Sequence, residues 1–486
     1  MKKVVIVILF AICFFNCTAQ KEGNIWCFGD SAGIDFNGVN PLPLTDIILN
    51  AFEPSSSISD SNGNLLFYMG PKILYSFDNY TVFNKLHQVM SNGDIPNGNY
   101  SATQGALILP FPSSPNMYYL FSIGLDTYNQ YNLTYNAVDM TLNLGLGGVQ
   151  NLNVILADTI TEKMVAVRHG NGRDWWVIVH RKDTDEFIKF LITPNGVSDQ
   201  IIQNIGGVMN YLNEYGQMVI SDDGKKICIA ASSGYLGLFD FDRCTGNISN
   251  ERSFGYQNIA NINQNYFYGI SFSPNGNVIY ASITDSLFQY DLTANNISLS
   301  KQLLWTIPNS SYHIGQHKLA PDGRIYIADS YGTSMPNNLY NTANMYLSVI
   351  NTPDSLGNSC NFTPFSFYLG GKRCYYGLPN NPNYKLGALF DSPCDTLSST
   401  NEILKESGGV SIFPSPNNGT FTLQYNLSAA GSLRVTDVLG REVYAYSLLN
   451  RSGQETISLP LSQGIYFWQV LQEHSVSAKG KLVIIK

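Results

Sequence analysis

Histidines are the first residues in this chain whose type and spacing could support metal chemistry. His313 and His317 have the i, i+4 spacing of a zinc-binding helix. The stretch around them, SYHIGQHKLAPDG, has no glutamate between the two and leads into a strand pattern. We therefore interpret them as structural histidines. His169 lies in RHGNGRDWW, a turn pattern in which contact with the backbone is expected.

Neighbouring carboxylates could support acid–base chemistry, but only if they share a pocket at a set distance. They occur as Asp183 with Asp185, Asp222 with Asp223, and Asp240 with Asp242. All three pairs are interpreted as solvated turn carboxylates. Asp240 and Asp242 could also contribute oxygen ligands to a calcium site, but the full loop pattern of such a site is missing. The sequence also has no GxSxG elbow, P-loop or kinase motif. We assign no catalytic, cofactor-binding or metal-binding residues from the sequence.

The composition indicates a chain made of strands and turns. Of 486 residues, 13% are charged and 13% are aromatic, and the charged share is about half of the usual ~25%. The apolar share of 44% is enough for a large core, which argues against disorder. The formal net charge of −8 and the lack of any basic run exclude nucleic acid as an expected partner.

The first residues, MKKVVIVILFAICFFNCTAQ, are typical of an export signal. Lys2 and Lys3 precede an apolar stretch that is too short to span a membrane, and small residues follow it. The pattern predicts a signal peptide over residues 1–19, cut between Ala19 and Gln20. The alternative is a lipoprotein acylated at Cys17, whose usual preceding Leu and small residue are replaced by Phe14 and Asn16.

Export permits disulfides among the six cysteines that follow residue 19. Cys228 and Cys244 flank two successive expected strands, so we predict that they pair. Cys360 with Cys374 is the next choice, which leaves Cys27 with Cys394. The alternative is that some of the six are buried thiols. No CxxC pair is present, which weakens zinc and redox interpretations.

Short turns that lead into strands recur along the body. The turn residues are Gly63, Asn116, Gly172, Gly224, Gly276, Gly323 and Gly371, and their separations are 53, 56, 52, 52, 47 and 48 residues. A steady period near 50 is typical of a β-propeller with one four-stranded blade per repeat. Asp-Gly and Asn-Gly suit the tight turns, and apolar runs such as VIYA suit strands buried on both faces.

We therefore expect an all-β body over residues 20–395, a propeller of seven blades, with six or eight as alternatives. The strand pattern at residues 24–28 could complete the last blade and close the ring. A large β-sandwich with accidental turn spacing is the rival architecture. The stretches SDDGKKICIAAS, SPNGNVIYASI and APDGRIYIADS resemble the WD40-like, PD40-type repeats of secreted bacterial propellers.

A polar, Ser-rich linker with two terminal glycines is expected at residues 396–409. Seven short alternating strands follow it in residues 410–486, which favours a small immunoglobulin-like β-sandwich. The alternative is an ordinary sandwich module that helps the body to bind a ligand.

This last segment resembles the type A C-terminal sorting domain of the type IX secretion system of Bacteroidetes. The residues that carry the resemblance are Pro414, Pro416, Gly419, Asp437, Gly440, Arg441, Gly464, Tyr466, Lys481 and Lys486. Ser415 stands where the motif usually has Asn. The resemblance implies periplasmic transit, passage of the outer membrane by the type IX machinery, and removal of the tail by a sortase-like peptidase. The product would be at the cell surface or released.

The body also resembles uncharacterised secreted Bacteroidetes proteins, some linked to gliding motility, in IWCFGDSAGIDFNG and YYGLPNNPNYKLG. Two functions follow as hypotheses. The first is a binding module for glycan or protein, which an aromatic-rich, weakly charged surface suits. The second is an extracellular hydrolase or lyase at the channel mouth. Carboxylates that converge on that mouth would distinguish them, and the missing catalytic motif favours binding.

Overall fold

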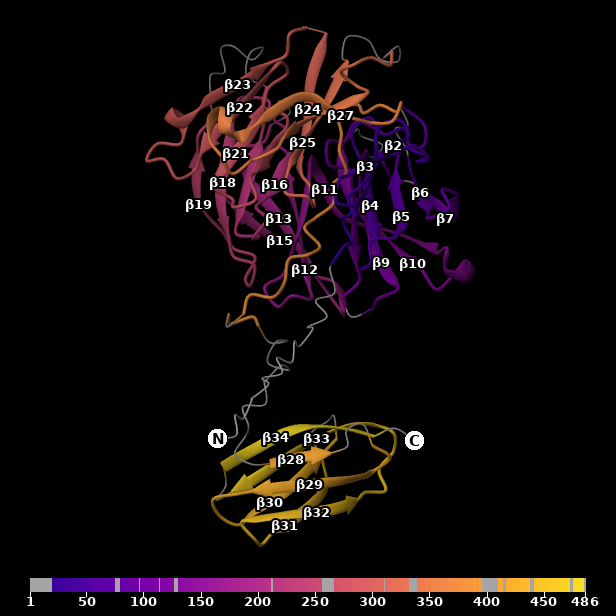
Figure 1. Ribbon diagram of the computed structural model, residues 1–486, viewed down its shortest axis with the longest axis vertical. Coiled ribbons are helices and arrows are strands. Elements are labelled where there is room, and N and C mark those ends of the chain that lie inside the picture. The colour runs from indigo at the N-terminus through magenta and orange to yellow at the C-terminus, as the bar shows by residue number, and fades with distance from the viewer. Residues whose placement is uncertain are drawn as a thin grey trace, which may run out of the picture. The chain divides into compact units, whose positions relative to one another are not determined.

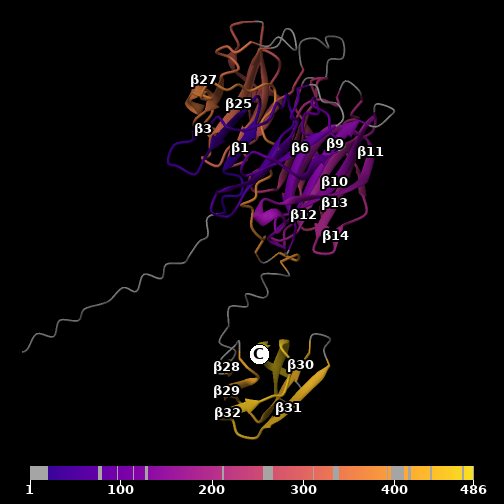
Figure 2. The same cartoon turned by 90° about the vertical axis from the view of Figure 1, so that its right-hand side faces the viewer.

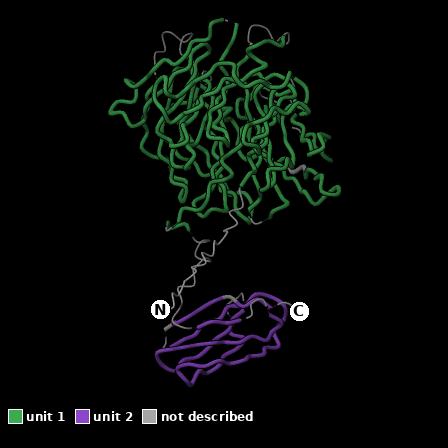
Figure 3. The backbone as a smooth tube through the Cα atoms, in the orientation of Figure 1, with its two compact units in different colours: residues 1–396 green, residues 397–486 purple. Residues whose placement is uncertain are grey.

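The structure is a computed structural model with two compact units, residues 1–396 and 397–486 (Figure 3). It describes residues 20–74, 79–95, 97–112, 114–125, 130–210, 213–255, 266–309, 311–331, 339–390, 392–395, 410–413, 417–437, 441–472 and 475–484. Strands dominate these ranges, with short 3-10 turns such as Asn143–Gly145, so the predicted all-β fold is confirmed. None of the helical turns in these ranges is long or apolar enough to cross a membrane.

Unit 1 consists of one three-stranded, one twelve-stranded and three four-stranded sheets (Figure 1). Their strands are antiparallel, except that β7 (Val89–Ile95) and β11 (Gly148–Arg168) pair in parallel where Ser91 meets Gly148. Three sheets have four strands each, the size of a propeller blade. Their strands are β16 (Met218–Ile220), β17 (Lys226–Ala230), β18 (Leu236–Phe241), β19 (Ile248–Ser253); β20 (Ile270–Phe272), β21 (Val278–Ser282), β22 (Ser286–Asp291), β23 (Gln302–Thr306); and β24 (Tyr312–Leu319), β25 (Ile325–Tyr331), β26 (Tyr346–Ile350), β27 (Phe362–Tyr368).

Two further blade-sized groups share a single long strand, β11 (Gly148–Arg168). Its first part pairs with β10 up to Ile160, and from Ile160 onward it pairs with β12. The outermost strand of one group therefore continues as the innermost strand of the next. The strands involved are β8 (Ala106–Pro110), β9 (Met117–Leu125), β10 (Tyr131–Asp139), β12 (Trp175–Arg181), β13 (Glu186–Thr193), β14 (Gly196–Val197) and β15 (Ile201–Asn204).

The strand β4 (Ser56–Ser59) begins another group, with β5 (Leu65–Gly70), β6 (Tyr80–Asn84) and β7 (Val89–Ile95) paired in order. The predicted turn glycines lie between first and second strands. Gly224 joins β16 to β17 with φ 74° and Gly276 joins β20 to β21 with φ 67°. Such values favour glycine, which explains why the Asp-Gly and Asn-Gly signal recurs in the sequence.

The prediction of a seventh strand-forming repeat around Gly371 is wrong. The stretch GGKRCYYGL forms no strand, and its only ladder contact in the described ranges is an isolated bridge from Arg373 to Asp30. The remaining sheet comes from the other end of the unit: β1 (Ile25–Phe28), β2 (Ala32–Asp35) and β3 (Leu42–Leu44). The strand at the N-terminal side thus forms a sheet of its own instead of extending the last one.

Side-chain packing joins this N-terminal sheet to neighbours on both sides. On one side Trp26 and Phe36 pack against Tyr326 of β25, with ring centroids 4.8–5.9 Å apart. On the other side Ile25 and Cys27 share a cluster with the sheet that contains β5 and β6. Figure 1 shows β2 and β3 near β27, and Figure 2 shows β1 and β3 near β25 and β27. Clusters of the same kind join each remaining pair of consecutive groups.

Unit 2 has two antiparallel sheets around one hydrophobic core that contains Phe421, Leu433, Trp468 and Leu482. One sheet has β28 (Val410–Phe413), β29 (Thr420–Asn426) and β32 (Ser452–Ser458). The other has β31 (Glu442–Leu448), β30 (Gly431–Thr436), β33 (Gly464–Gln472) and β34 (Ser475–Ile484). The alternation of buried and exposed residues along β29 and β32 is the pattern from which the strands were expected.

The packing predicts that Trp26 contributes strongly to the stability of unit 1, although it lies near the beginning of that unit. Trp26 is 1% exposed and contacts another sheet, so Trp26→Ala should lower the free energy of unfolding by about 3–5 kcal/mol. Denaturant unfolding of the mature chain measures the loss. Leu299→Ala, at a side chain that is 84% exposed, is the control and should change it by less than about 0.5 kcal/mol. Equal effects of the two substitutions would contradict the packing argument.

Candidate functional site

After β27 the chain runs between the sheets as an extended segment, residues 375–390, which we call the strap (orange in Figure 1). Its first residues are fixed by backbone hydrogen bonds. The amides of Tyr376 and Gly377 both donate to the carbonyl of Phe52 at 3.1 Å, and the amide of Gln316 donates to the carbonyl of Tyr376 at 2.8 Å. A Cβ at Gly377 would lie 1.8 Å from the carbonyl oxygen of Glu53, so this close approach requires glycine.

Side-chain amides hold the middle of the strap. The Asn381 side-chain oxygen accepts bonds from the Ser56 hydroxyl at 3.0 Å and the Ser57 amide at 2.9 Å. Asn380 donates to the Met164 carbonyl at 3.0 Å and accepts from Gln104 Nε2 at 3.2 Å. These contacts connect the strap to β4 and β11, so the middle of the strap is fixed to the sheets of unit 1.

Three cations from three sheets bind strap carbonyls at intervals of three residues. Lys318 Nζ donates to Asn381 O at 2.7 Å, Arg168 Nη2 donates to Tyr384 O at 3.2 Å, and Arg243 Nη2 donates to the carbonyl of Gly387. Within the described ranges none of the three forms a salt bridge with a carboxylate. A regular spacing of three suits an extended segment with the strap's Asn and Pro content.

A disulfide fixes the far end of the strap. Cys244, in the turn between β18 and β19, is bonded to Cys394. A Cβ at Gly170 would lie 2.4 Å from the sulfur of Cys394, so the disulfide lies directly against the turn between β11 and β12. The amide of Leu389 also donates to the carbonyl of Gly170 at 2.8 Å. The end of the strap is thus attached to two neighbouring sheets.

This bond corrects the predicted disulfides. The pairings Cys228–Cys244, Cys360–Cys374 and Cys27–Cys394 are wrong in this structure, where Cys27, Cys228, Cys360 and Cys374 are free and buried. The reason is the direction of the side chains. Cys228 lies on β17 with its thiol in the core between two sheets, whereas Cys244 lies in a turn at the end of its sheet. Sequence proximity along two strands does not bring such thiols together.

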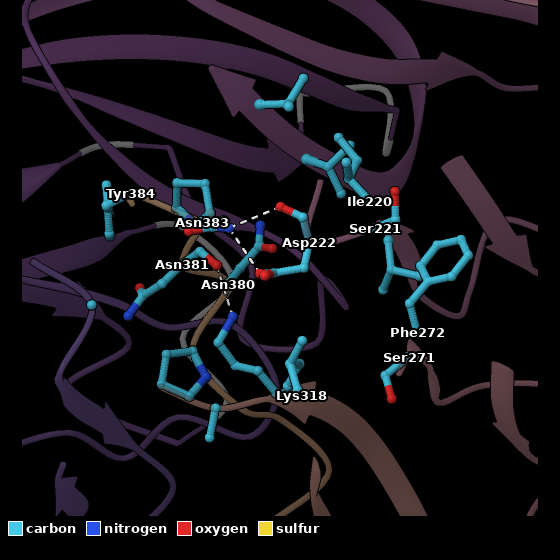
Figure 4. A pocket seen from close by; sticks show the side chains of 18 of the residues that line it. Ile220, Ser221, Asp222, Ser271, Phe272, Lys318, Asn380, Asn381, Asn383 and Tyr384 are labelled. Atoms are coloured by element: carbon cyan, nitrogen blue, oxygen red, sulfur yellow. Dashed lines mark hydrogen bonds between the residues drawn. The ribbon is translucent and has the colours of Figure 1, made fainter. Parts of the chain in front are cut away.

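A cavity with a volume of about 610 Å³ lies beside the strap and is called the pocket below (Figure 4). Its walls come from the ends of first strands, from the turns that follow them, and from the strap. The polar lining includes Asp222, Ser271, Lys318 and Asn383, and Phe272 contributes an apolar wall. Asn383 Nδ2 donates to the Asp222 side chain at 2.8 Å and to its carbonyl at 3.0 Å, which ties the strap to the turn after β16.

Lys318 differs from the other polar groups of the pocket. It is partly buried, and burial lowers the pKa of its ammonium to about 7. Its ammonium lies 5.7 Å from the ring centroid of Trp26. Figure 4 shows Lys318 reaching toward Asn381, with the Asn383–Asp222 contact beside it.

Of the histidines and aspartates singled out from the sequence, His317, Asp222 and Asp223 line the pocket, whereas the others do not. His317 is 1% exposed, and burial lowers the pKa of its imidazole to about 3. His313 contacts the Tyr376 hydroxyl at the start of the strap. Asp240 pairs with Arg252, and Asp242 accepts the amide of Cys244 at 2.8 Å. Among the described residues no group of three or more His, Cys, Asp or Glu is arranged to hold a metal ion.

Sequence reasoning missed two buried carboxylates near the start of the strap, Glu53 and Glu162. Glu162 Oε2 accepts the Thr103 amide at 2.9 Å and hydroxyl at 2.7 Å, and Oε1 accepts the Tyr131 hydroxyl at 2.6 Å. Burial raises the pKa of Glu162 to about 7. Burial raises the pKa of Glu53 well above its usual range, and the charge of Glu162 raises it further. The sequence contains no motif for this pair, because Glu53 and Glu162 are far apart in the chain and approach each other only in the folded unit.

The sorting-motif residues are described in part. Asp437 and Arg441 form a turn in which Arg441 N and Nε donate to the carboxylate at 3.0 and 2.7 Å. Gly419 has φ 100°, Gly464 begins β33, and the Tyr466 hydroxyl donates to Ser462 O at 3.1 Å. Pro414, Pro416, Gly440, Lys486 and Ala19 lie outside the described residues, as does the side chain of Lys481, whereas Gln20 is described and exposed.

Comparison with known families supports the interpretation of unit 2. The family model of the secretion system C-terminal sorting domain matches residues 411–486. The chain therefore carries a type IX sorting domain, which directs export to the cell surface or the extracellular space and implies contact with the type IX machinery. The chain thus combines this sorting domain with a body of successive, largely antiparallel sheets. No curated protein matches the chain.

Solved structures similar to the chain include two putative 6-phosphogluconolactonases and a β-propeller domain. The one from Bacteroides uniformis ATCC 8492 is 12% identical, with 65% of this chain and 93% of that chain covered and a TM-score of 0.44. The one from Bacteroides fragilis NCTC 9343 is 12% identical, with 74% and 98% covered and a TM-score of 0.44. The Cps50 (Swd1) propeller domain of Myceliophteria thermophila is 9% identical, with 63% and 93% covered and a TM-score of 0.35.

The disulfide at the end of the strap yields a prediction about redox conditions. Because Cys244–Cys394 closes a loop with a sequence separation of 150, its loss should lower the free energy of unfolding by about 2–5 kcal/mol. Thermal unfolding with and without a thiol reductant measures the effect. The double variant Cys244→Ser/Cys394→Ser should unfold at a lower temperature that the reductant no longer changes.

A thiol count supplies the control for this prediction. The denatured, unreduced mature chain should expose four titratable thiols, at Cys27, Cys228, Cys360 and Cys374. Two further thiols should appear on reduction. A count of zero before reduction would restore the pairings expected from the sequence and contradict the structure.

Proposed function

We propose that residues 20–395 form a closed seven-bladed propeller that acts outside the cell as a binding module for a polar ligand. Six blade-sized groups plus the sheet β1–β3 supply the blades, with β11 shared between two of them. The ring is supported by the N-terminal sheet, which packs against both the first and the last four-stranded groups. In a closed ring of this kind every sheet packs against a neighbour on each side.

The preformed pocket is the observation that carries the proposed binding function. Its volume of about 610 Å³ is within the range of roughly 300–1,000 Å³ that small-ligand sites occupy. Its walls are fixed by hydrogen bonds from the strap to several sheets, so a ligand would meet a rigid site at little cost in ordering. The hydroxyl and amide groups of Ser221, Ser271 and Asn380 suit the hydroxyl groups of a glycan or the polar surface of a protein segment.

Glycan-array and calorimetric binding to the mature chain would test this function. Asn383→Ala removes the contact that positions Asp222, and we expect it to weaken binding at least about tenfold, or about 1.4 kcal/mol. Asn195→Ala, at an exposed turn outside the pocket, is the matched control and should bind like the wild type. Binding that is unaffected by both substitutions would place the ligand elsewhere.

A hydrolase or lyase is the second candidate function, and the pair Glu53 and Glu162 favours it. A carboxyl group with a raised pKa can still carry a proton near neutral pH, which a general acid requires. Turnover of oligosaccharides that is abolished by Glu53→Gln or by Glu162→Gln would support the enzyme. Saturable binding without turnover in the wild type would support the binding module.

The remaining boundaries belong to the same proposal. Residues 1–19 would be removed before Gln20, residues 396–409 would be the linker in which a sortase-like peptidase cuts, and residues 410–486 would be an immunoglobulin-like sorting sandwich. Intact-mass analysis of the exported protein tests both cuts. A product that begins at Gln20 and ends within 396–409 supports them, whereas an acylated Cys17 would support the lipoprotein alternative.

A further inference from the structure

Lys318 lacks a counter-charge in the pocket. Its ammonium makes a hydrogen bond to a neutral carbonyl, that of Asn381, and no carboxylate of the described residues lies within 4 Å of it. A cation that is partly removed from water without an opposite charge is costly, so proteins normally pair such groups. The missing partner is therefore expected to come from outside the chain.

The carboxylates of the pocket do not fill this role, because both are engaged elsewhere. The Asp222 side chain accepts from Asn383. Asp223 accepts the Ser221 hydroxyl at 2.6 Å and the Lys225 amide at 3.1 Å. They lie on the turn after β16, while Lys318 projects from β24. Asp222 and Asp223 are thus hydrogen-bonded to other groups of the chain, and an external anion can take the position beside Lys318.

A second polar group of the pocket also lacks a partner. Ser271 is 3% exposed and lines the pocket, yet its hydroxyl makes no hydrogen bond in the structure. A buried hydroxyl without a partner loses its hydration without compensation, which a ligand hydroxyl would restore. The pocket therefore offers one position for an anion and another for a neutral hydroxyl.

We propose that the pocket binds an acidic glycan, with a uronic-acid carboxylate paired to Lys318 and sugar hydroxyls bonded to Ser271 and to the strap amides. This inference rests on the proposed binding function and gives its ligand class. A glycan is favoured over an acidic peptide because the lining places Lys318 and the exposed Lys385 among hydroxyl and amide groups that suit a polyol, while Asp222 and Asp223 would repel a run of carboxylates. A charge-assisted bond in a partly enclosed site is also stronger than a neutral one.

The test compares ligands that differ only in charge. Trimers of galacturonate, glucuronate and mannuronate, each with its fully methyl-esterified form, are titrated into the mature chain by calorimetry. We expect at least one acid to bind about tenfold or more tightly than its ester. Lys318→Met should remove that difference. Lys225→Met, at an exposed lysine of the neighbouring turn that does not line the pocket, should preserve it.

A chemical measurement on the wild type guards against a misfolded variant. Acylation of amines by an acetyl ester, read by peptide mass spectrometry, should decrease at Lys318 when the acid trimer is present and remain unchanged with the ester. Modification of Lys225 should not change with either ligand. Protection that is equal for acid and ester would overturn the charge pairing.

The outcomes separate this inference from the function on which it rests. Neutral glycans that bind as well as the acids, or a variant Lys318→Met that keeps the preference, would overturn the acidic ligand and leave the binding module intact. A preference for a poly-glutamate peptide or for sulfate esters over uronates would overturn the ligand class. Failure of every glycan and peptide to bind would overturn both.

Discussion

The packing of the N-terminal sheet between two others is the interaction on which unit 1 depends. Trp26 and Phe36 contact β25, while Ile25 and Cys27 contact the sheet of β5 and β6. Among the described residues, this sheet packs against both the group β4–β7 and the sheet β24–β27, the first and last four-stranded groups in chain order. A blade-sized sheet has two apolar faces, so any sheet without a second neighbour would expose one of them to water. The N-terminal sheet covers one face of the β24–β27 sheet and one face of the group that contains β5 and β6.

The strap is held in place by these sheets, and its residues contribute polar groups to the pocket. Backbone and amide contacts at Phe52, Ser56 and Met164 connect it to the segment before β4, to β4 and to β11. Its path divides the interior into two environments. One is the pocket with its lysine, and the other is the buried pair Glu53 and Glu162 near the start of the strap. Binding and acid–base chemistry, the two functions considered for this protein, are thus supported by different residues.

Local signals in the sequence predicted local structure. The turns at Gly224 and Gly276 and the apolar strands after them follow from backbone conformation and burial, which neighbouring residues determine. In unit 2 the expected strands and motif were sufficient to identify the sorting domain, which the family match confirms. Expectations failed where one segment could serve two sheets, as in β11, or where a missing blade could come from either end of the unit.

The site was less predictable than the fold, for the same reason. The Cys244–Cys394 bond, the pair Glu53 and Glu162, and the contact of Lys318 with Asn381 each join residues that are distant in the sequence. None has a motif, because each partner is an ordinary residue until the sheets are assembled. The stretch YYGLPNNPNYKLG carries the resemblance to secreted Bacteroidetes proteins, but its polar and proline-rich character does not indicate that residues such as Tyr375, Leu378 and Tyr384 are buried.

One covalent feature has a mechanical consequence for export. Cys394 precedes the segment in which the sorting domain would be detached, and its bond to Cys244 encloses the sheets β20–β23 and β24–β27 in one covalent ring. Pulling on the tail would load this bond before any hydrogen bond of residues 375–390. A cut on the tail side of Cys394 would likewise leave no loose end from which the interior could unravel. The disulfide that fixes the end of unit 1 therefore does not depend on the sorting domain.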